Sequence, residues 1–79
     1  TEAVRKKIEN EEKQLEKLGE KLAKIEQQLG DTSLYEDSRK ADLLKLLDEQ
    51  THLKGQIEAV EEQVMNLMMS LEDIENNFN

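Results

Sequence analysis

The sequence predicts an all-α fold, an antiparallel two-helix coiled-coil hairpin with a short helical turn at its tip. Apolar residues recur at alternating steps of three and four, which is the heptad spacing of helices that pack side by side. The spacing runs through two long segments and is lost between them, around residues 30–33. The 79 residues include no Pro and only three Gly, so few residues oppose helix formation.

The first predicted helix covers about residues 2–29. Its apolar stripe, with Glu11 counted as a core position, consists of Val4, Ile8, Leu15, Leu18, Leu22, Ile25 and Leu29. A disordered polar segment would not keep this phase over four heptads. We therefore expect the stripe to be buried against a second helix.

The end of the first helix is predicted from local signals. Gly30 follows the last apolar residue, where a C′ glycine is expected. Ser33 and Glu36 have the spacing of a capping box. Asp37 or Ser38 is the expected N-cap of the second helix.

The tip, residues 30–37, contains an apolar pair between its polar residues. This pair is Leu34 and Tyr35. The following helix carries Leu44 and Leu47 outside its heptad stripe. We expect the pair in the tip to cover these two leucines.

The second predicted helix covers about residues 38–76. Its stripe consists of Leu43, Leu46, Gln50, Leu53, Ile57, Val60, Val64, Leu67, Leu71, Ile74 and Phe78. A short connection makes two helices antiparallel neighbours. Layers counted from the turn pair Leu29 with Leu46, Leu22 with Leu53, Leu18 with Ile57 and Ile8 with Leu67, and a shift of one heptad stays open.

This register has two consequences along the rod. It places Gly19 and Gly55 at nearly the same height, where they would form a soft point. It also makes the second helix extend past the first, which leaves Ile74 and Phe78 without partners. We therefore expect residues 1–79 to be a single hairpin and a C-terminal fragment of a larger protein.

Composition excludes several kinds of site. The absence of Cys excludes disulfides, thiolate metal sites and Cys nucleophiles. His52 is the only histidine, with no partner at ligand spacing, so a solvated position is expected for it. Carboxylates on a two-helix rod have no cleft to shift their pKa values. We expect no catalytic, cofactor-binding or metal-binding residue, and no segment approaches the length of a membrane span.

The stretch LGDTSLYEDSRK, residues 29–40, resembles the hairpin tip of the C-terminal coiled-coil domain of ABC-F ATPases, above all the Uup and YheS branches. In both, a helix ends in a short Leu-Tyr turn and a Leu-rich helix returns. The specific part of the resemblance covers about residues 25–50. The remainder is coiled coil, which many unrelated proteins share.

The resemblance implies a non-catalytic arm on a cytoplasmic parent that carries two ATP-binding cassettes and no transmembrane domain. Many ABC-F proteins act on the ribosome in translation, and in at least one branch this hairpin is associated with nucleic-acid binding, including DNA. The chain has no G-x-x-x-x-G-K-[ST] phosphate loop. ATP and Mg are therefore expected only in the parent. The implied partners are the parent ATPase domains and ribosome, RNA or DNA, with no membrane.

The formal net charge of −8 is unevenly distributed. Residues 1–29 hold seven Lys or Arg and seven Glu, whereas residues 30–79 hold four Lys or Arg and twelve Asp or Glu. Since phosphate binding needs cations, two groups are candidates for a nucleic-acid contact. The first, on the outer face of the first helix, is Lys13, Lys17, Lys21 and Lys24, and the second, at the tip, is Arg39, Lys40 and Lys45.

Each candidate group has a plainer interpretation. The lysines of the first helix could form a solvated face paired with Glu9, Glu16 and Glu20. At the tip, Glu36 and Asp42 could neutralise Arg39. One Tyr cannot form a base-stacking platform, so any contact should be to the backbone of the nucleic acid.

The open end carries a methionine-rich surface that could dock a protein. The candidate residues are Met65, Met68, Met69, Ile74 and Phe78. Methionines adapt to many partners, but here they could also fill the core, contact the parent ATPase domains or form a weak homodimer. A structural self-association module is therefore the main alternative function. A tRNA-holding arm is a third possibility, although such arms should be more basic.

Overall fold

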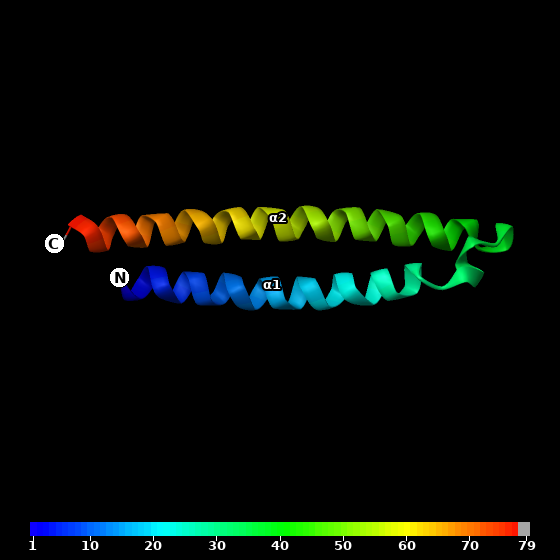
Figure 1. Cartoon of the computed structure of the whole chain (residues 1–79), viewed down its shortest axis with the longest axis horizontal. Helices are drawn as coiled ribbons and strands as arrows, with labels where there is room; N and C mark the ends of the chain where they lie inside the picture. Colours follow the sequence, from blue (N-terminus) through cyan, green and yellow to red (C-terminus); the bar gives the residue numbers. More distant parts are fainter. Residues whose placement is uncertain (78–79) are drawn as a thin grey trace.

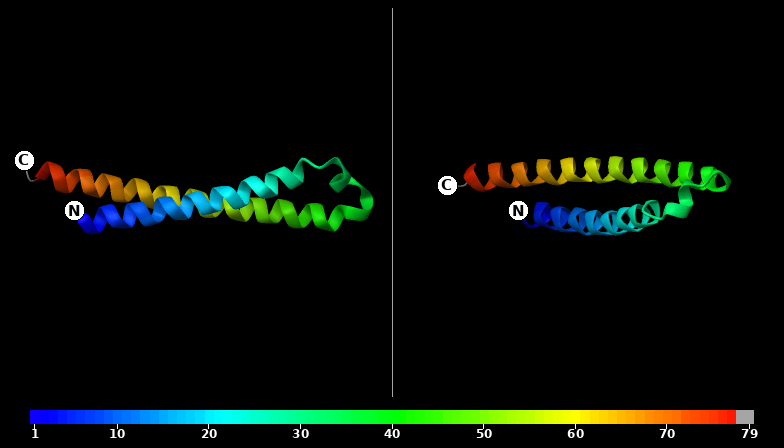
Figure 2. Two further views of the ribbon diagram at one scale, coloured as in Figure 1. Left: turned by 90° about the horizontal axis from the view of Figure 1, so that it is seen from below. Right: turned by 45° about the vertical axis from the view of Figure 1, so that its right-hand side comes forward.

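The computed structural model describes residues 1–77, which form one helical hairpin (Figure 1). In chain order the elements are α1 (Glu2–Leu29), the 3₁₀ turns η1 (Thr32–Tyr35) and η2 (Asp37–Arg39), and α2 (Lys40–Asn77). The rod measures 64 × 14 × 14 Å. The two helices run antiparallel and wind around each other (Figures 1 and 2).

The heptad stripes form the whole helix–helix interface. Every residue of α1, and of α2 as far as Asn76, that is less than fully exposed belongs to one of the two expected stripes. Ile8, Leu18, Leu53 and Val64 are buried, and the other members as far as Ile74 are half-buried. The predicted antiparallel two-helix hairpin is therefore confirmed. Most members stay half-buried because each helix has only one neighbour.

Among the described residues, two polar contacts join the helices. Gln50 Nε2 donates to Glu26 Oε2 at 3.3 Å, within one residue of the height expected from the register. The polar core position at Gln50 is thus satisfied across the interface. Near the open end, Arg5 and Glu75 form an ion pair at 2.6 Å.

The open end differs in part from the expectation. As expected, α2 extends past the beginning of α1 (Figure 1). Ile74, however, is half-buried and so is not left uncovered, which corrects the prediction for that residue. Phe78 lies outside the described residues.

The tip uses a different cap from the predicted one. One oxygen of the Asp31 carboxylate accepts hydrogen bonds from the Ser33 backbone N–H at 3.0 Å and from its hydroxyl at 2.9 Å. The capping box between Ser33 and Glu36 was therefore wrong, because Asp31 caps the earlier 3₁₀ turn. Gly30 is the C-cap of α1 with right-handed angles, φ −79° and ψ −8°, so the C′ role was also wrong.

The second helix is entered without a side-chain cap from the expected residues. Asp37 and Ser38 lie inside η2, which leads directly into α2 at Lys40. Helix α2 thus begins two residues later than predicted. The 3₁₀ turn replaces the cap because it continues the helical path of the chain.

The apolar residues of the tip divide into a core and a surface. Leu34 is 1% exposed and is the most buried side chain of the core. The Tyr35 hydroxyl donates a hydrogen bond to the Leu29 carbonyl oxygen at 2.7 Å, and Tyr35 itself remains exposed to solvent. Leu44 and Leu47 remain 58% and 41% exposed, so the prediction that the tip covers them was wrong.

Candidate functional site

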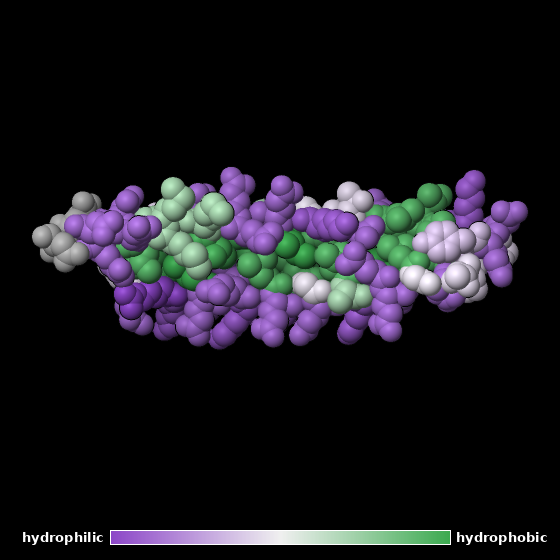
Figure 3. Space-filling model, viewed as in Figure 1, coloured by the Kyte–Doolittle hydropathy of each residue, from purple (hydrophilic) through white to green (hydrophobic). Residues whose placement is uncertain are grey.

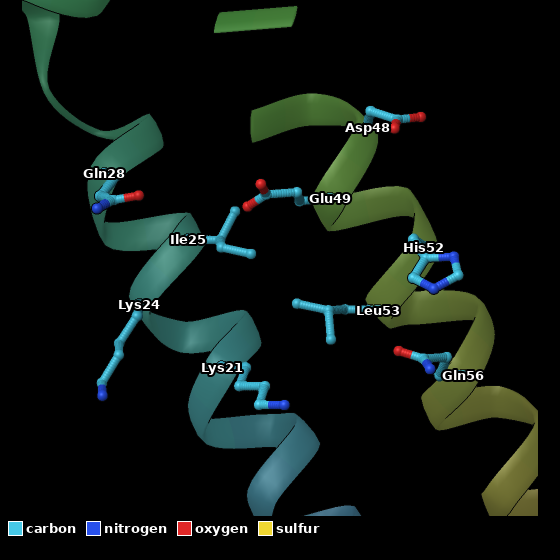
Figure 4. A pocket seen from close by; sticks show the side chains of 9 residues that line it. All are labelled: Lys21, Lys24, Ile25, Gln28, Asp48, Glu49, His52, Leu53 and Gln56. Atoms are coloured by element: carbon cyan, nitrogen blue, oxygen red, sulfur yellow. The ribbon is translucent and has the colours of Figure 1, made fainter. Parts of the chain in front are cut away.

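Two adjoining grooves line one side of the hairpin and contain several predicted contact residues. The first, of about 580 Å³, lies between α1 and α2 and is lined by Lys21, Lys24, Ile25, Gln28, Asp48, Glu49, His52, Leu53 and Gln56 (Figure 4). The second, of about 470 Å³, lies at the tip and is lined by Gln28, Asp31, Leu34, Arg39, Asp42, Lys45, Leu46 and Glu49. Gln28 and Glu49 border both grooves. We therefore call the two grooves together the groove face.

The floor of the first groove is the core itself. Figure 4 shows Ile25 and Leu53 pointing toward each other across the gap between the helices. Polar side chains form its rim, and Lys24 points away from the groove toward solvent (Figure 4). The groove is therefore an open channel along the helix interface, and Lys21 extends from α1 toward α2 beside it (Figure 4).

The groove face unites cations that are distant in the sequence. Lys21 and Lys24 of α1 lie on the same side of the rod as Lys45 of α2 and Arg39 of η2. The tip and α1 thus contribute cations to the same side of the rod. Lys13, Lys17 and Lys40 are exposed but line neither groove.

Carboxylates balance the cations of the groove face. The lining residues include four cations and also four acids, Asp31, Asp42, Asp48 and Glu49. A phosphate backbone would meet both signs of charge here. Electrostatic attraction on the groove face is therefore local, around individual side chains, and does not extend along the rod.

Arg39 is held within the tip. Its Nη1 donates to Ser33 Oγ at 3.2 Å, and its Nε donates to Asp42 Oδ2 at 3.4 Å. Of its two expected neutralising partners, Asp42 is confirmed, and Glu36 forms no ion pair with it among the described residues. Arg39 fastens η2 to η1, which leaves Lys45 as the freer cation of this groove.

On the outer face of α1, one expected ion pair forms. Lys13 Nζ lies 3.6 Å from Glu9 Oε1, and both side chains are about two-thirds exposed. A pair this exposed contributes little, because solvent screens it. Lys17, Lys21 and Lys24 form no ion pairs within residues 1–77.

The hydrogen bonds that Asp31 accepts stabilise its charged form. Hydrogen bonds from the backbone and the hydroxyl of Ser33 lower its pKa below 3.8, with a smaller contribution from Arg39. The carboxylate is thus held in its charged form by the groups it organises. This marks Asp31 as a structural residue of the tip.

Metal binding finds no geometric support in residues 1–77. His52 lies on the rim of the first groove and is exposed, as expected. Among these residues no cluster of three ligating side chains is placed to hold a metal ion. Within the same range, neither helix has an apolar stretch long enough to cross a bilayer.

The methionine-rich surface is exposed on α2. Met65, Met68 and Met69 are 62%, 48% and 58% exposed. Met65 and Met68 border an apolar groove of about 300 Å³, which Leu15, Glu61 and Val64 complete. Leu44 and Leu47 form a second exposed apolar pair, which was not predicted from the sequence. Their position outside the heptad stripe could have indicated that they are exposed.

Comparison of the chain with protein-family models, with curated proteins and with solved structures finds no match.

Proposed function

We propose that this hairpin is a non-catalytic accessory arm of a cytoplasmic ATP-binding protein of the ABC-F type. In this role it joins the ATPase domains of its parent to a contact on nucleic acid, either ribosomal RNA or DNA. The ATP and Mg chemistry belongs to the parent. The arm sets distance and orientation, and it provides side chains at its far end.

The observation that carries this proposal is the shape of the hairpin. A rod 64 Å long and 14 Å wide, closed by a compact tip, suits a spacer between two distant bodies. Its core is one continuous stripe, and the tip is fastened by the Asp31 and Arg39 hydrogen bonds. Both features support an arm that transmits position without bending at its end.

The cations of the groove face are the proposed contact. Lys21 and Lys45 are exposed and have no ion pair among the described residues. Because acids lie beside them, we expect a weak contact with the phosphate backbone and no reading of bases. Such a contact would add to those made by the parent.

A paired charge reversal tests the contact. Lys21→Glu with Lys45→Glu should weaken binding to a nucleic-acid duplex at least tenfold at low salt, measured by fluorescence anisotropy. Lys6→Glu with Lys7→Glu makes the same change of net charge near the open end and serves as the control. Equal binding by the two double variants would contradict a contact through the groove face.

The family assignment has its own test. The coding sequence upstream of Thr1 should specify two ATP-binding cassettes, each with a G-x-x-x-x-G-K-[ST] loop. If another kind of domain is encoded there, the ABC-F proposal is wrong. The contact test above would then still decide whether the hairpin itself binds nucleic acid.

A further inference from the structure

Helix α2 carries a second stripe of heptad spacing that does not face α1. Alternating steps of four and three connect Lys40, Leu44, Leu47, Thr51, Lys54, Glu58, Glu61, Met65, Met68 and Glu72. All ten residues are exposed. We call this set the outer stripe. It lies roughly a quarter turn around α2 from the core stripe, as heptad positions next to a core do.

The outer stripe is apolar in two places and charged between them. Leu44 and Leu47 form one apolar group near the tip, and Met65 and Met68 form another toward the open end. Figure 3 shows exposed apolar side chains on the α2 side toward both ends, with hydrophilic ones between them. Such a face, with heptad spacing, is suited to pack against another helix.

When two copies of the outer stripe are placed antiparallel, residues of one copy face residues of complementary charge or apolar character on the other. Turned end for end about residue 56, the stripe brings each lysine to a glutamate and each leucine to a methionine. The pairs are Lys40 with Glu72, Leu44 with Met68, Leu47 with Met65, Thr51 with Glu61 and Lys54 with Glu58. We propose that a second copy of this chain packs antiparallel on the outer stripe, α2 against α2, with these pairs in register.

Symmetry makes each favourable pair count twice. In a two-fold dimer the same patch is used on both copies, so every contact of one residue with its partner is repeated. The centre holds two contacts between Lys54 and Glu58 of opposite copies, and two apolar clusters flank it. Within residues 1–77 neither Lys54 nor Glu58 is engaged in an ion pair.

Charge selects the antiparallel orientation. Parallel copies would also match leucines with leucines and methionines with methionines. They would, however, place Lys54 against Lys54 and Glu58 against Glu58, and like charges facing each other oppose pairing. Only the reversed arrangement satisfies both the apolar groups and the charges.

Charge-reversal variants of the 79-residue chain test the proposal by analytical ultracentrifugation. The native chain should form dimers. Lys54→Glu places four carboxylates at the centre of the dimer and should weaken dimerisation about tenfold, and Glu58→Lys should do the same with four ammonium groups. Circular dichroism checks that each variant keeps its helices. Lys6→Glu, off the stripe, makes the same charge change as Lys54→Glu and should leave dimerisation unchanged.

Mixing the two variants isolates the contact between copies. A mixture of Lys54→Glu and Glu58→Lys chains should form heterodimers at native strength, because each reversed residue then faces its opposite. Charges within each chain do not change on mixing. A native chain that stays monomeric up to roughly 1 mM, or a Lys54→Glu chain that dimerises like the native one, would overturn the proposal. The second result is the one a parallel dimer would give.

Discussion

The Asp31 carboxylate organises the tip through a single oxygen. It accepts both the backbone and the hydroxyl hydrogen bonds of Ser33, whose oxygen in turn accepts from Arg39. The turn that reverses the chain therefore depends on a small hydrogen-bonded group. Local sequence signals favoured Ser33 and Glu36 for this role, since their spacing fits a capping box. The backbone of the 3₁₀ turn Thr32–Tyr35 determines that Asp31 is its cap. The spacing of Ser33 and Glu36 in the sequence does not reveal that this turn forms.

Acid should weaken the tip by protonating Asp31. Its pKa is lower in the folded chain than the ordinary 3.8, so its stabilising effect is complete above pH 3.8 and is lost as the pH falls through the lower folded value. Thermal unfolding followed from about pH 7 to about pH 2 should show a smaller acid-induced loss for Asp31→Ala than for the native chain. The exposed Asp48→Ala variant is the control, and identical losses in all three chains would exclude this role.

The two mid-helix glycines should lower stability without any structural benefit. An added Cβ at Gly19 or at Gly55 meets no atom within 4 Å. Because Gly in a helix interior is unfavourable relative to Ala, each Ala replacement should stabilise the hairpin by about 1 kcal/mol. Urea unfolding of the single and double variants measures this. The double variant should gain about twice as much. No gain in either would show that the glycines have a role within the rod.

At the scale of elements, heptad spacing was sufficient to predict both helices. The residues that lose exposure on α1 and α2 are those of the expected stripes, including the polar positions Glu11 and Gln50. The spacing works because one stripe per helix is all that a two-helix rod buries. The connection was harder to predict. There the chain forms two short 3₁₀ turns, whose hydrogen bonds are local and have no repeat in the sequence.

The tip depends on Leu34 for its apolar core. Since Leu34 is 1% exposed and Leu44 is 58% exposed, truncation should affect them very differently. Leu34→Ala should cost roughly 2–5 kcal/mol of unfolding free energy, and Leu44→Ala less than about 0.5 kcal/mol. Urea unfolding at low chain concentration, where copies stay apart, provides both values. Equal costs would mean that the tip is not packed on Leu34.

At the scale of the whole molecule, charge divides the rod into distinct faces. The helical repeat of α1 predicted that Lys13, Lys17, Lys21 and Lys24 would share a side, and of these Lys21 and Lys24 line the first groove. It could not predict which acids of α2 would lie beside them, because that depends on the register between the helices. The structure places Asp48 and Glu49 there, and the resulting balance of charge restricts the proposed contact to single lysines.

The outer stripe of α2 is a property of the same scale. The sequence pattern predicted that the tip covers Leu44 and Leu47, whereas in the structure both are exposed. Once both they and the methionines are at the surface, the complementarity of the stripe with its reverse becomes apparent. The self-pairing and the nucleic-acid contact use different sides of the rod, since the grooves are lined by neither apolar group of the stripe.

The distance between two labelled sites across the hairpin tests the central claim, that the two apolar stripes fold back on each other within one chain. The chain has no Cys, so Asn10→Cys and Asn66→Cys introduce two unique labelling sites on exposed residues. Electron–electron distance measurements, with labelled chains diluted in unlabelled ones, should give a separation below about 30 Å, as for adjacent packed helices. A separation of about 84 Å, the length of about 56 residues in one unbroken helix, would contradict the hairpin.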